Sequence, residues 1–220
     1  MKLKYALHRL REKGVMRCLG IMRERLLFTR WHLLWMEREL DMPLNLRPLY
    51  PGLQWRRADS AGVQSLKQYF PAFAHLAPEL LHEQTPGYLL FREETVVGYI
   101  WFSLRDYYDR QFYHYHFTVP EKSAFVINVE LLPSLRRRGT ASVITRIFAD
   151  LRGRGVERIS AVIADTNQPS LALALATGFN ERGTMLQVSR YFGAFTRAQA
   201  LSYEPPLLSH LRRYKGESAA

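Results

Sequence analysis

The chain has 220 residues, 47% of them hydrophobic and 23% charged, which suits one globular domain with a full core plus an appendage. Its single cysteine, Cys18, excludes an internal disulfide and gives no metal-ligand pattern. No stretch reaches the roughly 20 apolar residues that cross a bilayer, and the N-terminus lacks a signal peptide's apolar block and cleavage site. We therefore expect a cytoplasmic protein.

Residues 1–40 are the most basic part of the chain. They hold ten lysines and arginines against four glutamates, so they contribute +6 to a net charge of +11. Leu3, Leu7 and Leu10 recur at helical spacing, which predicts one or two amphipathic helices bent near Gly14. Such helices can pack on the domain, pair two subunits in a homodimer, or lie on an anionic membrane. We favour protein packing, with peripheral membrane contact as the alternative.

The later elements follow from hydrophobic periodicity and from turn residues. The sequence predicts strands at 54–58, 87–92, 95–102, 123–132, 158–164 and 184–192, and helices at 60–70, 78–84, 139–153 and 168–176. Asp59 or Ser60 caps the first of these helices, and Glu93 and Glu94 form the turn of a hairpin. The aromatic stretch 105–116 is either a loop or a strand pair.

Composition and proline content divide the chain into four parts. They are a basic amphipathic helical extension (1–42), a linker with three prolines (43–52), one domain (53–205) and a C-terminal tail (206–220).

The run from Val126 to Ile144 carries the clearest functional signal. It indicates an apolar strand, a short turn with three consecutive arginines at 136–138, and a helix that begins near Gly139. A helix N-terminus exposes unpaired backbone N–H groups that attract negative charge, and glycine lets a ligand approach the backbone. The turn therefore indicates a site for a phosphate or a pyrophosphate.

The spacing Arg136-x-x-Gly139-x-Ala141 resembles the Arg/Gln-x-x-Gly-x-Gly/Ala signature of the GNAT superfamily, the Gcn5-related N-acetyltransferases. Downstream, the segment from Asn167 to Phe179 is similar to the family's Asn-x-x-Ala/Ser…Gly-Phe element. The resemblance covers about residues 52–195. It implies the GNAT fold, an α/β (α+β) domain whose central mixed, mostly antiparallel sheet is flanked by helices, here with an extra N-terminal helical segment.

The resemblance implies acetyl-CoA as co-substrate and no metal. In the family, the pantetheine arm pairs with the backbone of the fourth strand, and the pyrophosphate lies on the turn that follows. The residues thereby assigned to the coenzyme are Val129, Leu131, Arg136, Arg137, Arg138, Gly139, Thr140, Ala141 and Asn167. For Asn167, capping of the helix at 168–176 is an equally open role.

Direct attack of an amine through a tetrahedral intermediate needs a base for the amine and a proton for the departing thiolate. The candidate catalytic residues are Glu130, in the strand beside the expected thioester, and His116. An ion pair between Glu130 and the arginines of the turn is the structural alternative. Many family members carry a tyrosine seven positions after the asparagine, but this chain has Ala174 there, so the usual proton donor is missing.

These features together predict an N-acetyltransferase that acts on an amine of a small molecule or a sugar-linked acceptor. Tyr107, Tyr108, Tyr113 and Tyr115 are candidates for an acceptor pocket, or else they pack on the core. The alternative function is a catalytically weak, GNAT-like coenzyme-binding or scaffold protein that docks to a partner or membrane through its N-terminal helices. The sequence has no nucleic-acid-binding motif, so we expect no nucleic acid partner.

Overall fold

The computed structural model describes residues 28–41, 43–44, 52–83, 85–135, 140–192 and 195–208. The strands are β1 (Phe28–Glu39), β2 (Leu53–Arg57), β3 (Gly87–Arg92), β4 (Thr95–Ser103), β5 (Tyr107–Asp109), β6 (Tyr115–Phe117), β7 (Ser123–Leu131), β8 (Arg158–Ala164), β9 (Asn180–Tyr191) and β10 (Phe195–Ser202). The helices are α3 (Ser60–Tyr69), α4 (Pro71–Ala74), α5 (Ala77–His82), α6 (Thr140–Gly153) and α7 (Gln168–Ala176), with a 3-10 turn at Pro133–Leu135.

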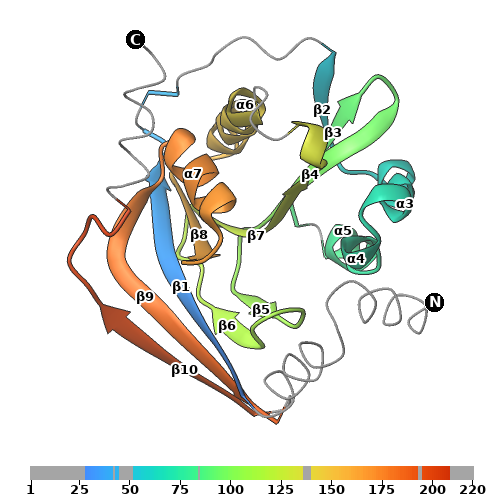
Figure 1. The fold of residues 1–220 in the computed structure, drawn as a ribbon. Helices are drawn as coiled ribbons and strands as arrows, with labels where there is room; N and C mark the ends of the chain where they lie inside the picture. Colours follow the sequence, from blue (N-terminus) through green and yellow to red (C-terminus); the bar gives the residue numbers. More distant parts are fainter. Residues whose placement is uncertain are drawn as a thin grey trace.

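Eight of the strands form one sheet, and β5 and β6 form a small hairpin beside it (Figure 1). The order in the large sheet is β10-β9-β1-β8-β7-β4-β3-β2. Neighbouring strands are antiparallel, except that β7 and β8 are parallel. A mixed, mostly antiparallel sheet flanked by helices confirms the predicted fold class.

Side-chain alternation buries both faces of the sheet around β3 and β4. Tyr88 and Leu90 join the core formed with α6 and α7, whereas Leu89 and Phe91 join the core formed with α3, α4 and α5. The two groups of helices therefore cover opposite faces (Figure 1). None of the described helices combines the length and the apolar composition needed to cross a membrane.

Residues 28–39 form the interior strand β1, so the prediction of a helix is wrong there. This strand pairs with β8 on one edge and with β9 on the other, and Leu33, Leu34 and Met36 are fully buried. A strand that is buried on both faces is apolar at consecutive positions, so it lacks the alternation that distinguishes a strand from a helix. The rest of the predicted helical extension, residues 1–27, lies outside the described residues, as does most of the predicted linker.

Arg38 fixes the end of β1 to the end of α7. Its buried guanidinium donates hydrogen bonds to the carbonyl oxygens of Thr177 and Pro43, and burial lowers the pKa of Arg38 from its ordinary value. Gly178 has a φ of 89°, and a β-carbon at this position would overlap the guanidinium. The N-terminal strand is thus an integral part of the domain.

The aromatic stretch is a strand pair rather than a loop. The β5–β6 hairpin packs on β1, β7 and β9, where Phe117 and Phe125 stack at 4.6 Å between ring centroids. The last predicted strand, 184–192, begins earlier, at Asn180, and a further strand that the sequence did not predict, β10, pairs with its outer edge.

Candidate functional site

Strands β7 and β8 run together for only three residue pairs and then separate. Their parallel ladder joins residues 123–125 to residues 158–160, whereas β7 continues to Leu131 and β8 to Ala164. On its other edge, β7 stays paired with β4 as far as Leu131. One backbone edge of β7, from Val126 onward, therefore faces the gap without a ladder partner among the described strands.

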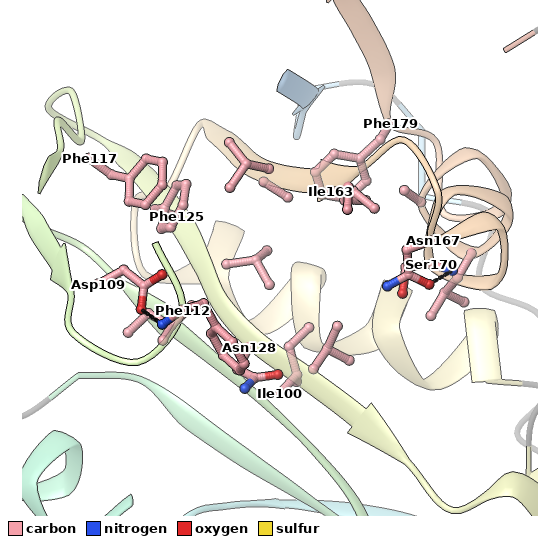
Figure 2. Close-up of a pocket in the computed structure, with 18 of the residues that line it drawn as sticks. Ile100, Asp109, Phe112, Phe117, Phe125, Asn128, Ile163, Asn167, Ser170 and Phe179 are labelled. Atoms are coloured by element: carbon pink, nitrogen blue, oxygen red, sulfur yellow. Dashed lines mark hydrogen bonds between the residues drawn. The ribbon is translucent and has the colours of Figure 1, made fainter. Parts of the chain in front are cut away.

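A cavity of about 290 Å³ occupies this gap, and we call it the main cavity because of its position between β7 and β8. On the helical face its lining includes Ile144 and Phe148 of α6 and Ala174 of α7, and on the hairpin face it includes Tyr113 and Phe117. Figure 2 shows the hairpin end with Asp109 and Phe112, and the α7 end with Asn167 and Ser170. The cavity therefore reaches both faces of the sheet.

The register of β7 against β4 shifts in the middle of the cavity. Trp101 pairs with Asn128, while the next residue, Phe102, pairs with Val126, so Ile127 is an extra residue in a β-bulge. Asn128 lines the cavity, and its side-chain amide makes no hydrogen bond with any other residue that the structure describes. The sequence does not predict Asn128 as a site residue, because the β-bulge beside it has no sequence signature here.

Apart from Asn167, the predicted coenzyme residues divide into three groups. Val129 lines the cavity, whereas the side chain of Leu131 is buried in the core, which leaves only its backbone for a ligand. Thr140 and Ala141 open helix α6, and the Thr140 hydroxyl donates to the carbonyl of Leu135 at 3.0 Å. Arg136, Arg137, Arg138 and Gly139 lie outside the described residues.

Asn167 caps α7 and also lines the cavity. Its side-chain oxygen accepts a hydrogen bond from the backbone N–H of Ser170 at 3.3 Å, which is the capping geometry. The amide nitrogen of Asn167 is left on the cavity side (Figure 2). Asn167 can therefore cap α7 with its oxygen and contact a ligand with its nitrogen.

Glu130 does not line the main cavity. Its exposed carboxylate accepts a hydrogen bond from the hydroxyl of buried Tyr99 at 3.2 Å. Burial, with the charge of Glu130 as a second cause, raises the pKa of Tyr99. No ion pair joins Glu130 to an arginine within the described parts of the chain.

His116 lies on the outer side of the hairpin. Its exposed ring is 5.0 Å from that of Tyr108, and it lines a second cavity of about 420 Å³ between α5 and the hairpin. Tyr107 lines both cavities, so it stands between His116 and the gap. The structure thus places neither predicted catalytic residue in the lining of the main cavity.

Asp109 is the carboxylate that does line the main cavity, and no sequence pattern predicts it as a site residue. It is buried and accepts hydrogen bonds from the backbone N–H groups of Gln111, Phe112 and Tyr113 at 2.9, 3.1 and 3.0 Å. Burial, together with the charge of Asp109, raises the pKa of Tyr113 to about 12. These three amide contacts give Asp109 a structural role in the hairpin turn.

Ala174 lines the cavity at the position where the family pattern has a tyrosine. The neighbouring hydroxyl of Thr177 is already engaged, because it donates to the carbonyl oxygens of Leu173 and Ala174 at 3.0 Å each. The α7 side of the cavity therefore has no tyrosine hydroxyl to protonate a leaving group.

The fold and the sequence can be compared with known proteins. Among solved structures, the chain is similar to a GCN5-related N-acetyltransferase from Sphaerobacter thermophilus, with 13% identity, a TM-score of 0.54, and coverage of 82% of this chain and 57% of that one. It is also similar to a Drosophila protein, with 13% identity, a TM-score of 0.55, and coverage of 81% and 57%. The chain thus spans little more than half the length of either protein, and at these identities the likeness concerns the fold.

No curated protein matches the sequence. The model of the Acetyltransferase (GNAT) family, however, matches residues 52–179, which is more than half of the chain and runs from β2 to the end of the α7 region. This match includes the free edge of β7, the cavity and the start of α6. The chain belongs to the acetyltransferase (GNAT) family.

Proposed function

We propose that the protein is an acyl-CoA-dependent N-acyltransferase that moves an acetyl group from acetyl-CoA to an amine of a small molecule or a sugar-linked acceptor. The observation that carries this proposal is the cavity between β7 and β8, which has a free strand edge along it and reaches both faces of the sheet. A donor from the α6–α7 face and an acceptor from the hairpin face can meet there.

The residues around the gap fit a phosphopantetheine coenzyme. The amides of its arm can pair with the free edge of β7 at Val129 to Leu131, as an added strand does. After β7 the chain passes through a 3-10 turn and begins α6 at Thr140, and a helix N-terminus favours a pyrophosphate. The arginines at 136–138 add positive potential to the same part of the sequence. When bound, the coenzyme would supply the acetyl thioester.

The acceptor end of the cavity is aromatic. Tyr107, Phe112, Tyr113 and Phe117 line it from the hairpin, opposite Phe125 of β7. Aromatic rings favour contact with flat or ring-shaped apolar surfaces, so an amine carried on a sugar or an aromatic ring suits this end. Tyr108 and Tyr115 do not line the main cavity and have no part in this proposal.

Two steps of the reaction involve protons: the amine must lose one, and the departing thiolate must be stabilised. Glu130 lies one residue beyond Val129, which lines the cavity, and can take the amine's proton through a water molecule. His116 is the alternative base and would act from the far side of Tyr107. The thiol of the coenzyme has a pKa near roughly 8.5, judged from cysteine, so its thiolate can leave without a tyrosine donor.

The coenzyme site can be tested with a pair of glycine variants. We expect Gly139→Val to weaken acetyl-CoA binding about tenfold or more, about 1.4 kcal/mol, because the added side chain blocks backbone approach to the predicted anion site. Gly153→Val, at the other end of α6, is the matched control, since a β-carbon there meets no atom within 4 Å. Calorimetry that finds equal affinities for the two variants would remove the basis of the anion site.

The role of Glu130 requires a measurement of turnover. We expect Glu130→Gln to lower kcat by roughly 10² while coenzyme affinity stays nearly constant, because the amide cannot accept the proton. Tyr99→Phe keeps the carboxylate and removes only its hydrogen-bond donor, so it should lower kcat much less. Free thiol release with a panel of amines measures kcat for both variants. Normal turnover of Glu130→Gln would return this residue to a structural role.

A second candidate function, coenzyme binding with weak catalysis, is favoured by one observation. Among the described residues, the only carboxylate that lines the main cavity is Asp109, and its oxygens accept hydrogen bonds from three backbone amides of the hairpin turn. A protein of this kind would bind acetyl-CoA with the expected dependence on Gly139 but release no thiol with any amine. The same two assays therefore separate the two functions.

A further inference from the structure

Four aromatic side chains are exposed at one end of the large sheet. Phe28 and Tyr191 are each 37% exposed, Phe192 is 68% exposed and Phe195 is 71% exposed. They lie where β1 begins, β9 ends and β10 begins, at the bottom of the view in Figure 1 and far from α6. We call these four residues the aromatic tip.

The aromatic tip is an ordered part of the sheet. Phe28 pairs with Tyr191, and Tyr191 pairs with Phe195, so three of the rings belong to one cross-strand row. The rings of Phe28 and Tyr191 lie 5.2 Å apart between centroids. Cross-strand registration holds the rings at the surface, although folding normally removes such groups from water.

Positive charge accompanies the rings. Arg30, Arg190 and Arg197 lie on the same three strand ends, and the sequence has no aspartate or glutamate at 28–36 or at 183–203. Arg30 lies over the ring of Phe28 at 5.0 Å. None of the three arginines forms an ion pair with a carboxylate that the structure describes. The end of the sheet is thus both aromatic and cationic.

The sequence adjoining the tip is also basic. Residues 1–27, which lead directly into Phe28, hold eight lysines and arginines against two glutamates. Basic residues close to an anionic lipid surface contribute about 1 kcal/mol each to binding, and aromatic rings prefer the level of the headgroups. Basic and aromatic side chains therefore both favour an anionic lipid surface as the partner.

We propose that the aromatic tip docks the protein onto an anionic phospholipid surface, with the rings in the headgroup layer and with Arg30 and Arg197 on lipid phosphates. A second copy of the chain fits this surface poorly, because a two-fold contact would bring like charges together. A single-stranded nucleic acid also takes rings and arginines, but it needs them along a groove, whereas these rings gather at the end of three strands. This docking does not depend on the proposed acyl transfer.

The test uses the full chain and flotation with vesicles of phosphatidylcholine, with or without phosphatidylglycerol. We expect binding only to the anionic vesicles, and weaker binding at high salt because the charges are then screened. Phe192→Ser with Phe195→Ser should reduce the partition coefficient about tenfold, as should Arg30→Gln with Arg197→Gln. Arg190 is left unchanged, because it also donates to the carbonyl of Phe112 in the hairpin at 3.1 Å.

Matched substitutions elsewhere control for general loss of apolar or positive surface. Leu207 is 51% exposed and Arg92 is exposed, and both lie outside the tip, so Leu207→Ser with Arg92→Gln should bind the vesicles like the unaltered chain. Equal binding by the tip variants and the control would overturn the proposal and assign any affinity to other basic residues. Failure to bind anionic vesicles, or a tip-dependent dimer or oligonucleotide complex in place of vesicle binding, would overturn it too. Thiol release without vesicles reports separately on the proposed acyl transfer.

Discussion

The two halves of the large sheet are assembled in different ways. In the half made of β2, β3, β4 and β7, the strands pair in the order in which they occur along the chain. In the other half, β1 is inserted between β8 and β9, so that Leu34 pairs with Ile163 on one side and with Met185 on the other. The first half rests on local pairings, and the second depends on a strand from the distant N-terminal part of the chain.

The stability of the site depends on the half of the sheet that contains β1. Pairings between distant segments carry a larger loop-closure entropy and form late, whereas hairpins form early. Strand β8, one wall of the gap, has β1 as its partner along its whole length, but it pairs with β7 only at residues 158–160. The separation of β7 and β8 therefore relies on β1 to hold β8 in place.

A substitution that disrupts β1 itself should destabilise the fold most. Leu34→Pro removes a backbone donor and a buried side chain from an interior strand, so we expect a loss of more than about 4 kcal/mol and no stable fold. Gln54→Pro in the edge strand β2 should cost at most about 1.5 kcal/mol. Circular dichroism with urea unfolding measures both. Similar stabilities of the two variants would show that the sheet does not depend on β1 more than on the edge strand β2.

A smaller effect tests α7, which connects β8 and β9 in the second half. Ala174→Tyr and Ala174→Phe occupy the cavity equally, but only the tyrosine carries a hydroxyl that can protonate a thiolate. We expect kcat of Ala174→Tyr to exceed that of Ala174→Phe by about tenfold or more. Thiol release at saturating acetyl-CoA is the measurement. Equal rates would mean that departure of the thiolate does not limit turnover.

The smallest effect concerns the hairpin that packs against both halves. The pKa of Tyr113 is raised to about 12 by burial, so its contribution to stability is fully present below the unfolded value of about 10. As the pH rises from about 10 to 12, the unfolded chain ionises first and the folded state becomes less stable. Tyr113→Phe should lose less stability than the unaltered chain between about pH 9 and 11. Urea unfolding at both pH values measures the difference, and equal losses would contradict it.

Elements whose limits are marked by neighbouring residues could be predicted from the sequence, in both halves of the sheet. Of the two predicted caps, Asp59 and Ser60, it is Asp59 that caps α3, by accepting a hydrogen bond from the backbone N–H of Gly62. The predicted limits of β8 and α7 coincide with those observed, since Asn167 and Pro169 mark the start of the helix. These elements are specified by neighbouring residues.

Long-range features could not be predicted in the same way. Trp31 and Trp35 are four positions apart, a spacing that places them on one face of a helix and equally on one face of a strand. Strand β10 alternates only weakly and contains the small residues Ala198 and Ala200, so its position beside β9 depends on tertiary pairing. Asp109 and Asn128 reach the cavity through a hairpin turn and a bulge, which have no sequence signature here.

The cavity that reaches both faces of the sheet has a kinetic consequence. If donor and acceptor enter from opposite sides, neither blocks the path of the other, and both are present when the acyl group moves. Initial rates plotted against one substrate at several levels of the other should then give intersecting rather than parallel lines, because no acylated form of the protein accumulates. The spent coenzyme should compete with acetyl-CoA but not with the amine. This pattern of product inhibition would show that the two substrates enter the cavity independently, one from each face of the sheet.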